Sequence, residues 1–344
     1  MMNTRMETQV QVQTSPGLWA LAWRRLRADR VAMVSLAVVL LFLLSVLLSA
    51  TGLVAADWED EVAVNYAPPT FVGPDPALAA LAQPQAPVPP NAFDPLAPDI
   101  AVLKAKLARE GHVHAAAKRT TLPFGADKWG HDIIKKTIKG GQTSIVVGLV
   151  AALVAVVLGT VFGALSGFYG GLVDDFFNWF YSVFTSIPSI LMILAVAAVL
   201  QTRGVLTIVL ILGLTGWTGP YRLIRAEYIK HKAREYVMAA DAIGASNLRK
   251  MFSHILPNVS HVALVQMSIL VVGFIKAEVI LSFLGFGVPV GTVSWGSMLN
   301  EAQNELILGK WWQLAAAASS MAVLVTAFSL FADALRDALD PKLK

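Results

Sequence analysis

Few side chains in this sequence can carry acid–base, nucleophilic or metal chemistry, and they are widely separated. The 344 residues include no cysteine, no glycine-rich phosphate loop ending in Lys-Ser/Thr, and no pair of histidines four apart. His112 and His114 flank a single residue, a spacing more typical of a solvated pair than of a metal site. We therefore predict no catalytic residues, no cofactor and no metal.

Lys276 and Glu278 are unusual because they stand at the end of a long apolar stretch. An ionisable side chain at mid-membrane costs about 2.5–3.5 kcal/mol, so each needs a partner or water. Residues two apart cannot face each other on a helix. Glu278 therefore either lies at the mouth of a pathway or hydrogen-bonds the following turn, SFLGFG (282–287), and we favour the second role. Gly285 and Gly287 in this turn complete a candidate outer gate.

A second candidate site is the basic stretch 234–258, REYVMAADAIGASNLRKMFSHILPN, which lies between long apolar segments. So many charges cannot lie in hydrocarbon, so the stretch must be a loop on one face of a membrane. Gly244 should end a first helix and Ser246 should cap a second. Pro257 is tolerated in the first turn of the helix that follows. We predict two short helices across the mouth of a bundle.

Two faces of these helices are suited to a partner protein. The spacing i, i+7, i+11 of three small residues predicts a face that another surface can approach closely. These residues are Ala233, Ala240 and Gly244. A second face is apolar, with spacing i, i+4, i+7. It consists of Leu248, Phe252 and Ile255. We expect docking here, the alternative being a cytoplasmic helix hairpin without a partner.

The composition is that of a membrane protein. Hydrophobic residues make up 56% and charged residues 15% of the chain, against about 45–50% and 25% in soluble domains. A transmembrane helix needs about 20 apolar residues. Suitable uncharged runs occur at 31–56, 140–173, 176–202, 204–221, 255–275 and 311–332. We predict an all-α membrane protein with six transmembrane helices. The short run 204–221, rich in glycine at its end, should pack tightly against a neighbour.

Lys and Arg predict the orientation of these helices, because cytoplasmic loops are enriched in them. Arginines precede the first span, and further basic clusters occupy 222–254 and the C-terminal segment. Both termini are therefore expected in the cytoplasm. The 31–54 stretch is longer than a signal-peptide core, so we expect a retained anchor. The predicted organisation is a cytoplasmic segment 1–30, a first helix 31–54, a periplasmic segment 55–139, and a core 140–344 with five helices and the loop 222–257.

The 234–258 stretch resembles the coupling loop of bacterial ABC-importer permeases. That motif reads Glu-Ala-Ala, three residues, Gly, nine residues, Ile-x-Leu-Pro. The residues at motif spacing here are Ala239, Ala240, Gly244, Leu256 and Pro257. Met238 and His254 stand where the motif has Glu and Ile. The candidate ATPase-coupling loop also includes Glu235, Ala245 and Ser246.

The resemblance extends to the C-type permease subunits of dipeptide and oligopeptide importers. The segments that carry it, in family order, are FGADKWGHD (124–132), YGGLVDD (169–175), TSIPSIL (185–191), AEVILSFLGFGVP (277–289), SWGSML (294–299) and DALRDALDPKLK (333–344). The likeness covers most of 18–54 and 122–344 but not 55–121.

This resemblance implies a type I ABC-importer permease fold in a bacterial inner membrane. It implies a permease subunit that pairs with a second, homologous permease and engages two ATPase subunits or domains through the coupling loop. A periplasmic substrate-binding protein would deliver peptides, and the ATPases would hydrolyse ATP. The net charge of +4 fits a cytoplasmic membrane face and does not indicate nucleic acid.

The sequence is compatible with other classes of transporter. A related importer for nickel or another small solute would have the same permease architecture. A self-sufficient secondary transporter would show inverted repeats and mid-membrane acids, and neither is visible. A membrane enzyme would need a base and nucleophile pair.

The segment 66–98 holds ten of the seventeen prolines. This composition favours extended polyproline-like segments over a packed core. The following residues 100–110 predict a short amphipathic helix. Either the periplasmic segment contacts the binding protein or the partner permease, or it is an insertion tolerated without function.

Overall fold

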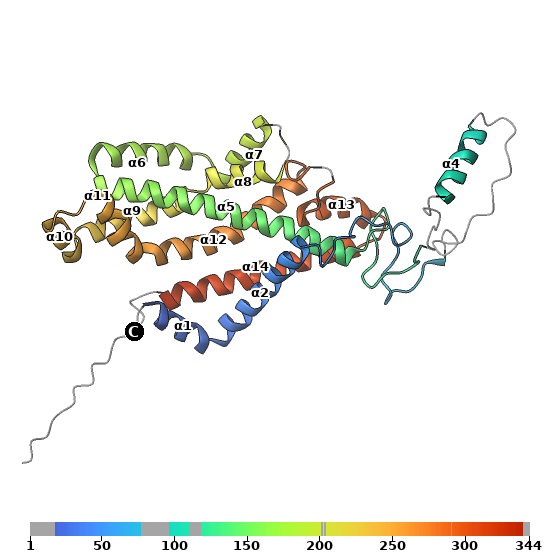
Figure 1. Ribbon diagram of the computed structural model, residues 1–344, viewed down its shortest axis with the longest axis horizontal. Coiled ribbons are helices and arrows are strands. Elements are labelled where there is room, and N and C mark those ends of the chain that lie inside the picture. The colour runs from blue at the N-terminus through green and yellow to red at the C-terminus, as the bar shows by residue number, and fades with distance from the viewer. Residues whose placement is uncertain are drawn as a thin grey trace, which may run out of the picture.

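The computed structural model describes residues 18–76, 96–109, 118–200, 202, 204–289 and 291–339. Figure 1 shows an elongated helical bundle, with irregular segments and the separate helix α4 (Ala97–Arg109) at one end. In the described residues, β-pairing is limited to three isolated bridges between 63 and 132. The predicted all-α fold is confirmed, and α4 confirms the helix predicted near 100–110. Residues 77–95, within the proline-rich segment, and His112 and His114 lie outside the described residues.

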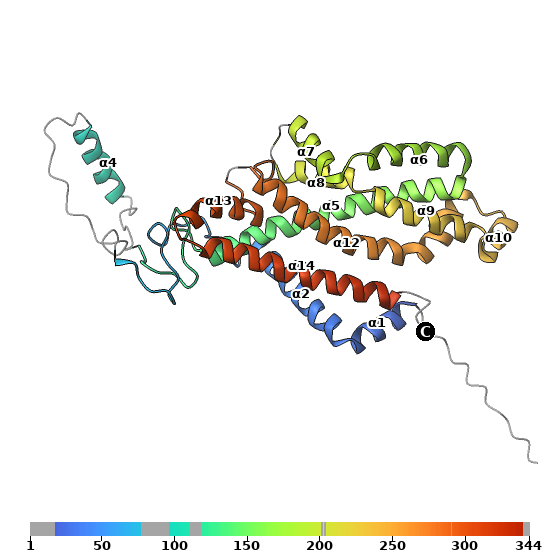
Figure 2. The same ribbon diagram turned by 180° about the vertical axis from the view of Figure 1, so that it is seen from behind.

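The N-terminal part forms two helices, α1 (Leu18–Ala28) and α2 (Arg30–Ala50). Asp29 separates them and caps α2, its Oδ1 accepting hydrogen bonds from the backbone N–H groups of Val31 (2.8 Å) and Ala32 (3.2 Å). α2 packs along the C-terminal helix α14 (Trp312–Leu339), as both views show (Figure 2). It ends at residue 50, whereas the sequence predicted a helix to 54.

The central element is α5 (Ile133–Tyr169), which begins seven residues before the predicted run. Its 37 residues are about 55 Å long, more than the ~30 Å of a hydrocarbon core. Gly159, Gly163 and Gly167 form a stripe against α9 (Thr218–Lys232). A Cβ at each would lie only 2.6–2.8 Å from a backbone oxygen of α9 or of its N-cap residue Trp217. The missing side chains therefore let the two backbones meet.

The third predicted span is not one straight helix. It consists of α6 (Gly171–Thr185) and α7 (Ser189–Leu200), which are bent by 84° at the break. Pro188 stands in this break. Proline lacks an N–H group and disfavours helical backbone in the residue before it, which explains why the helix ends here.

The fourth predicted run, 204–221, forms only α8 (Val205–Thr215), and α9 follows after a short turn. A Cβ on Gly213 would lie 2.8 Å from the Val154 side chain, and one on Gly216 would lie 2.3 Å from Phe274. The tight packing predicted for this run is therefore confirmed. α9 extends eleven residues, 222 to 232, into the stretch expected to be a loop.

The remaining core helices are α12 (Leu256–Phe283), α13 (Trp295–Ile307) and α14. Four helices of the described chain are long and apolar enough to cross a membrane, and the bent pair α6–α7 makes a fifth candidate. The remaining predicted crossing falls on the short apolar α8, which has 11 residues, about 17 Å, and so extends over only part of a ~30 Å hydrocarbon core by itself. The principal core, between α5, α8, α12 and α14, is apolar and includes the fully buried Leu212 and the nearly buried Trp295.

Candidate functional site

The loop 234–255 folds at one end of the bundle, where Figure 1 places α10 (Glu235–Ala242) and α11 (Asn247–Arg249). Gly244 has a φ of +82°, a left-handed conformation that favours glycine. The Ala245 N–H donates to the Ala240 carbonyl at 3.0 Å, which closes the turn. Ser246 caps α11 by accepting a hydrogen bond from the Arg249 N–H at 3.4 Å. The predicted break and cap are both confirmed.

The two predicted faces do not form as continuous surfaces. Ala233 belongs to the end of α9, because the chain leaves helical geometry at Arg234, so it cannot share a helix face with Ala240. Residues 250–255 form a π-helix, η1, whose wider turns change the register. Ile255 is consequently buried, whereas Leu248 is 62% exposed. The predicted apolar face of Leu248, Phe252 and Ile255 is therefore divided between the core and the surface.

The loop combines a buried anchor with an exposed apolar surface. Val237, Met251 and Ile255 pack with residues of α5 and α9. The Tyr228 hydroxyl donates to the Met251 carbonyl at 3.1 Å and fixes η1 to α9. The exposed apolar side chains are Met238, Ile243, Leu248 and Phe252. Several large apolar side chains exposed on one short loop indicate a surface for a protein partner.

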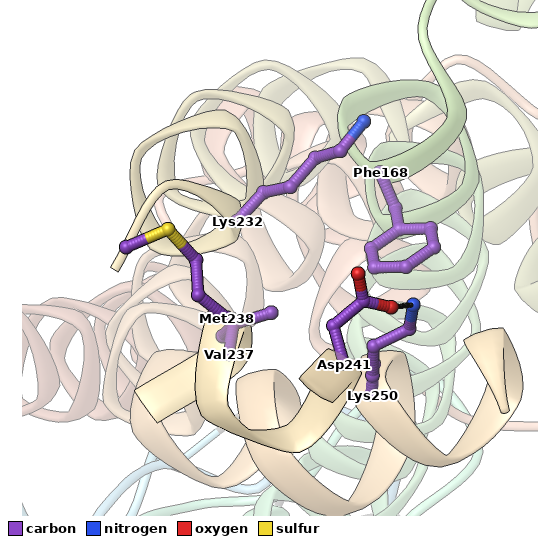
Figure 3. Close-up of a pocket in the computed structure, with 6 residues that line it drawn as sticks. All are labelled: Phe168, Lys232, Val237, Met238, Asp241 and Lys250. Carbon is purple, nitrogen blue, oxygen red and sulfur yellow. Dashed lines mark hydrogen bonds and ion pairs between the residues drawn. The ribbon is translucent and has the colours of Figure 1, made fainter. Parts of the chain in front are cut away.

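A small recess of about 110 Å³ lies beside this surface (Figure 3). The Lys232 and Lys250 Nζ atoms lie 5.5 and 5.9 Å from the centre of the Phe168 ring. Lys250 also pairs with Asp241 at 2.5 Å. Met238, at the position of the motif's Glu, forms an apolar wall of the recess. The recess therefore offers a cationic corner where a partner's side chain can enter.

Next to the loop, a bidentate ion pair fixes three helices. The Arg225 Nε and Nη2 atoms donate to the Asp174 carboxylate, both at 2.6 Å. Ser166 also donates to Asp174, which joins α5 and α6 to α9. Asp174 belongs to the segment YGGLVDD, and sequence reasoning did not find its partner because Arg225 is 51 residues away.

Glu278 is fully buried at the other end of α12. Its carboxylate accepts hydrogen bonds from Ser144 on α5 (2.6 Å) and from Ser282 (2.7 Å). Ser282 Oγ accepts from the Val288 N–H at 3.3 Å, so the carboxylate is linked to the turn that follows. Lys276 is exposed and points elsewhere on the helix. This geometry favours the structural role of Glu278 over the pathway role.

The two glycines of this turn are needed for different reasons: Gly285 for its backbone conformation and Gly287 for its close contact with Ser282. Gly285 has a φ of +82°. A Cβ on Gly287 would lie 1.9 Å from Ser282 Oγ, so no larger residue fits without displacing that serine. Beside the turn is an open cavity of about 750 Å³ whose lining includes Trp58, Trp129, Gly285 and Asn300.

A buried ionic cluster, missed by sequence reasoning, borders the same cavity. Lys136 Nζ donates to Asp127 and Glu301, both at 2.7 Å, and to Gln313 at 3.2 Å. Asp127 is fully buried and also accepts hydrogen bonds from the backbone N–H groups of Trp129 and His131. Burial alone would raise the pKa of Asp127, but the Lys136 ammonium and these hydrogen bonds lower it below its ordinary value.

Glu305 on α13 lies near this cluster, and both its carboxylate oxygens are buried without a hydrogen-bond partner among the residues that the structure describes. Burial raises the pKa of Glu305 to about 7, against the opposing effect of Lys136. The only sequence signal for the cluster was a lysine at the start of a long apolar helix.

The structure combines membrane-length helices with the exposed apolar loop 234–255 at one end and the hydrogen-bonded turn 282–287 at the other. This combination defines a multi-pass membrane protein with a surface for a partner protein. Residues 159–344 match the family described as "Binding-protein-dependent transport system inner membrane component", and the chain belongs to this family. It is a multi-pass inner-membrane permease subunit. Residues 17–69 match a second family, "N-terminal TM domain of oligopeptide transport permease C".

Curated relatives agree with this assignment. The chain is 36% identical over 221 residues to the dipeptide transport system permease protein DppC of Bacillus subtilis, covering 64% of this chain and 69% of the relative. It is 36% identical over 219 residues to the oligopeptide transport system permease protein OppC of Salmonella typhimurium, covering 64% of this chain and 72% of the relative.

Proposed function

We propose that this permease passes di- or oligopeptides from a periplasmic binding protein into the cytoplasm, driven by ATP hydrolysis in partner subunits. The observation that carries the proposal is the 234–255 loop, an apolar surface anchored on α5 and α9 with the spacing of an ATPase-coupling motif. The peptide substrate is supported by the names of the relatives, which are dipeptide and oligopeptide permeases.

The partners follow from the same features. One bundle with one docking loop supplies half of a pathway, so we propose that a second, homologous permease pairs with this one and that each engages an ATPase. The exposed apolar side chains of α6 and α7, including Leu172, Trp179 and Leu191, suit such a helical partner or lipid. ATP-driven closure of the ATPases would move the docked loops and switch the helices between two states.

The substrate can be tested with the purified transporter complex and its cognate binding protein in proteoliposomes. We expect di- and oligopeptides to stimulate ATP hydrolysis and to accumulate inside the vesicles. A nickel chelate added at the same concentration serves as the control and should do neither. Stimulation by the chelate and not by peptides would contradict the peptide assignment and favour the small-solute alternative.

The proposed orientation places both termini and the docking loop in the cytoplasm. Single cysteines at Thr70 and Ser246, which are both exposed, should react from opposite sides of the membrane. An impermeant maleimide added to spheroplasts is expected to label Thr70→Cys only, and Ser246→Cys only after lysis. The absence of native cysteine makes the background low. Labelling of both positions before lysis would contradict the six-span arrangement.

A further inference from the structure

A cavity of about 550 Å³ lies between α9, α12 and α14, apart from the docking recess and from the outer turn. Its polar lining consists of Arg222, Glu227, His261, Gln266 and Arg336. Its apolar lining consists of Leu223, Ala226, Val262, Val265 and Leu339. Neither the coupling loop nor the outer gate uses these side chains.

The charge of this cavity is unbalanced. Arg222 and Arg336 form no ion pair with the described carboxylates. The one acid in the lining, Glu227, already pairs with Lys230 at 2.9 Å. The Nδ1 atom of His261 is buried and has no hydrogen-bond partner among the described residues. Arg222 and Arg336 are exposed to the cavity, and together with the unpartnered imidazole nitrogen they offer several hydrogen-bond donors suited to an anion with several oxygen atoms.

The depth of the cavity fits one kind of anion. Arg336 is three residues before the end of α14, and His261 is five residues after the start of α12. At about 1.5 Å per residue, Arg336 lies roughly 5 Å from the end of α14, and in the proposed orientation this end is at the level of the cytoplasmic lipid headgroups. Val265 and Gln266 lie about one turn further along α12 than His261, and Leu223, Val262 and Val265 give the cavity an apolar wall. A cationic entrance above an apolar slot matches a phosphate that carries acyl chains.

We propose that this cavity binds the phosphate of an anionic phospholipid from the cytoplasmic leaflet. The two arginines hold the phosphate oxygens, His261 Nδ1–H donates a third hydrogen bond, and the first methylenes of an acyl chain lie against Val262 and Val265. Because α9 leads into the docking loop and α12 leads out of it, the lipid bridges the two helices on which that loop is mounted. The inference rests on the proposed orientation, in which residues 222–254 face the cytoplasm.

The test counts lipids bound to the complete transporter complex. Complexes reconstituted in equal parts of phosphatidylglycerol and phosphatidylcholine are transferred to mild detergent, and retained lipids are identified by native mass spectrometry. We expect the wild type to retain phosphatidylglycerol. The double variant Arg222→Gln, Arg336→Gln should retain at least about tenfold less, since each cation near the membrane surface contributes to anionic lipid binding.

Four comparisons make this result specific. The variant Arg24→Gln, Arg30→Gln removes two exposed arginines outside the cavity and should retain lipid as the wild type does. The variant Arg222→Lys, Arg336→Lys keeps both charges and should retain most of the lipid, which separates loss of the site from misfolding. Inorganic phosphate should not displace the phospholipid, because it lacks acyl chains. A free peptide should not displace it more effectively than the same peptide with an amidated C-terminus.

Equal retention by the Gln variant and the wild type would overturn the proposal. Displacement by phosphate would identify a site for free anions instead, and displacement by the free peptide alone would identify a site for the substrate carboxylate. These measurements need neither transport nor ATP hydrolysis. If the complex failed to transport peptides, phospholipid retention could still be measured and interpreted. If Ser246→Cys were labelled from outside, residues 222–254 would not face the cytoplasm, and a lipid of the cytoplasmic leaflet could not occupy the cavity.

Discussion

Replacing Lys136 by Met is expected to destabilise strongly the end of the bundle that carries α13. The ammonium group of Lys136 neutralises Asp127, which is fully buried, and also binds Glu301. Removing one partner of a buried ion pair leaves an uncompensated charge and costs about 3–5 kcal/mol. The thermal unfolding midpoint of the purified protein, followed by tryptophan fluorescence, should fall by several degrees or more.

The neighbouring Lys135 provides a matched control. It pairs with Asp57 at 2.5 Å, but both side chains are substantially exposed. An ion pair in contact with water contributes little to stability, so Lys135→Met should leave the midpoint nearly unchanged. If the two variants unfold at the same temperature, Lys136 does not hold the cluster together as its contacts indicate.

Gly244→Arg is expected to leave the permease inserted in the membrane but unable to retain its ATPase partners. A non-glycine residue at a φ of +82° is strained, and a long charged side chain would project from the docking surface. No described atom lies within 4 Å of a Cβ at this position, so the effect should fall on the partner and not on packing within the chain. Co-purification of the ATPases with the tagged permease measures the loss.

Gly244→Asn separates the effect of backbone strain from the effect of a long charged side chain. Asparagine tolerates the left-handed conformation better than other side chains and carries no charge. It should retain considerably more ATPase than the Arg variant. Full retention by Gly244→Arg would show that the ATPases do not approach this part of the loop, and the coupling role of 234–255 would lose its main support.

The sequence predicted those elements whose signals are local. Gly244 and Ser246 have local roles as a helix break and a cap, and the structure places them in those roles. The glycines of 204–221 likewise predicted close packing, since small residues admit a neighbour whichever helix it is. The stripe Gly159, Gly163, Gly167 carried the same signal at four-residue spacing and was readable on the same grounds.

Features that depend on distant partners could not be predicted. Lys136 is a buried cation because Asp127, Glu301 and Gln313 converge on it from three other segments, and no pattern near Lys136 encodes that meeting. The π-helix at 250–255 also involves a distant residue, because the Tyr228 hydroxyl on α9 donates a hydrogen bond to the Met251 carbonyl within it. Pro188 can be read from the sequence as a helix breaker. The 84° angle between α6 and α7 cannot, because it depends on where each of the two helices packs.

The absence of any break between α11, η1 and α12 has a mechanical consequence. Residues Asn247–Phe283 form one rod of 37 residues, about 55 Å long. Its first turns belong to the docking surface, and its last turns carry Glu278 and lead into the turn held by Ser282. In a stiff rod of this length, a tilt of only ~5° displaces the far end by ~5 Å. A tilt applied at the docking surface would therefore be transmitted through this single helix to the turn held by Ser282.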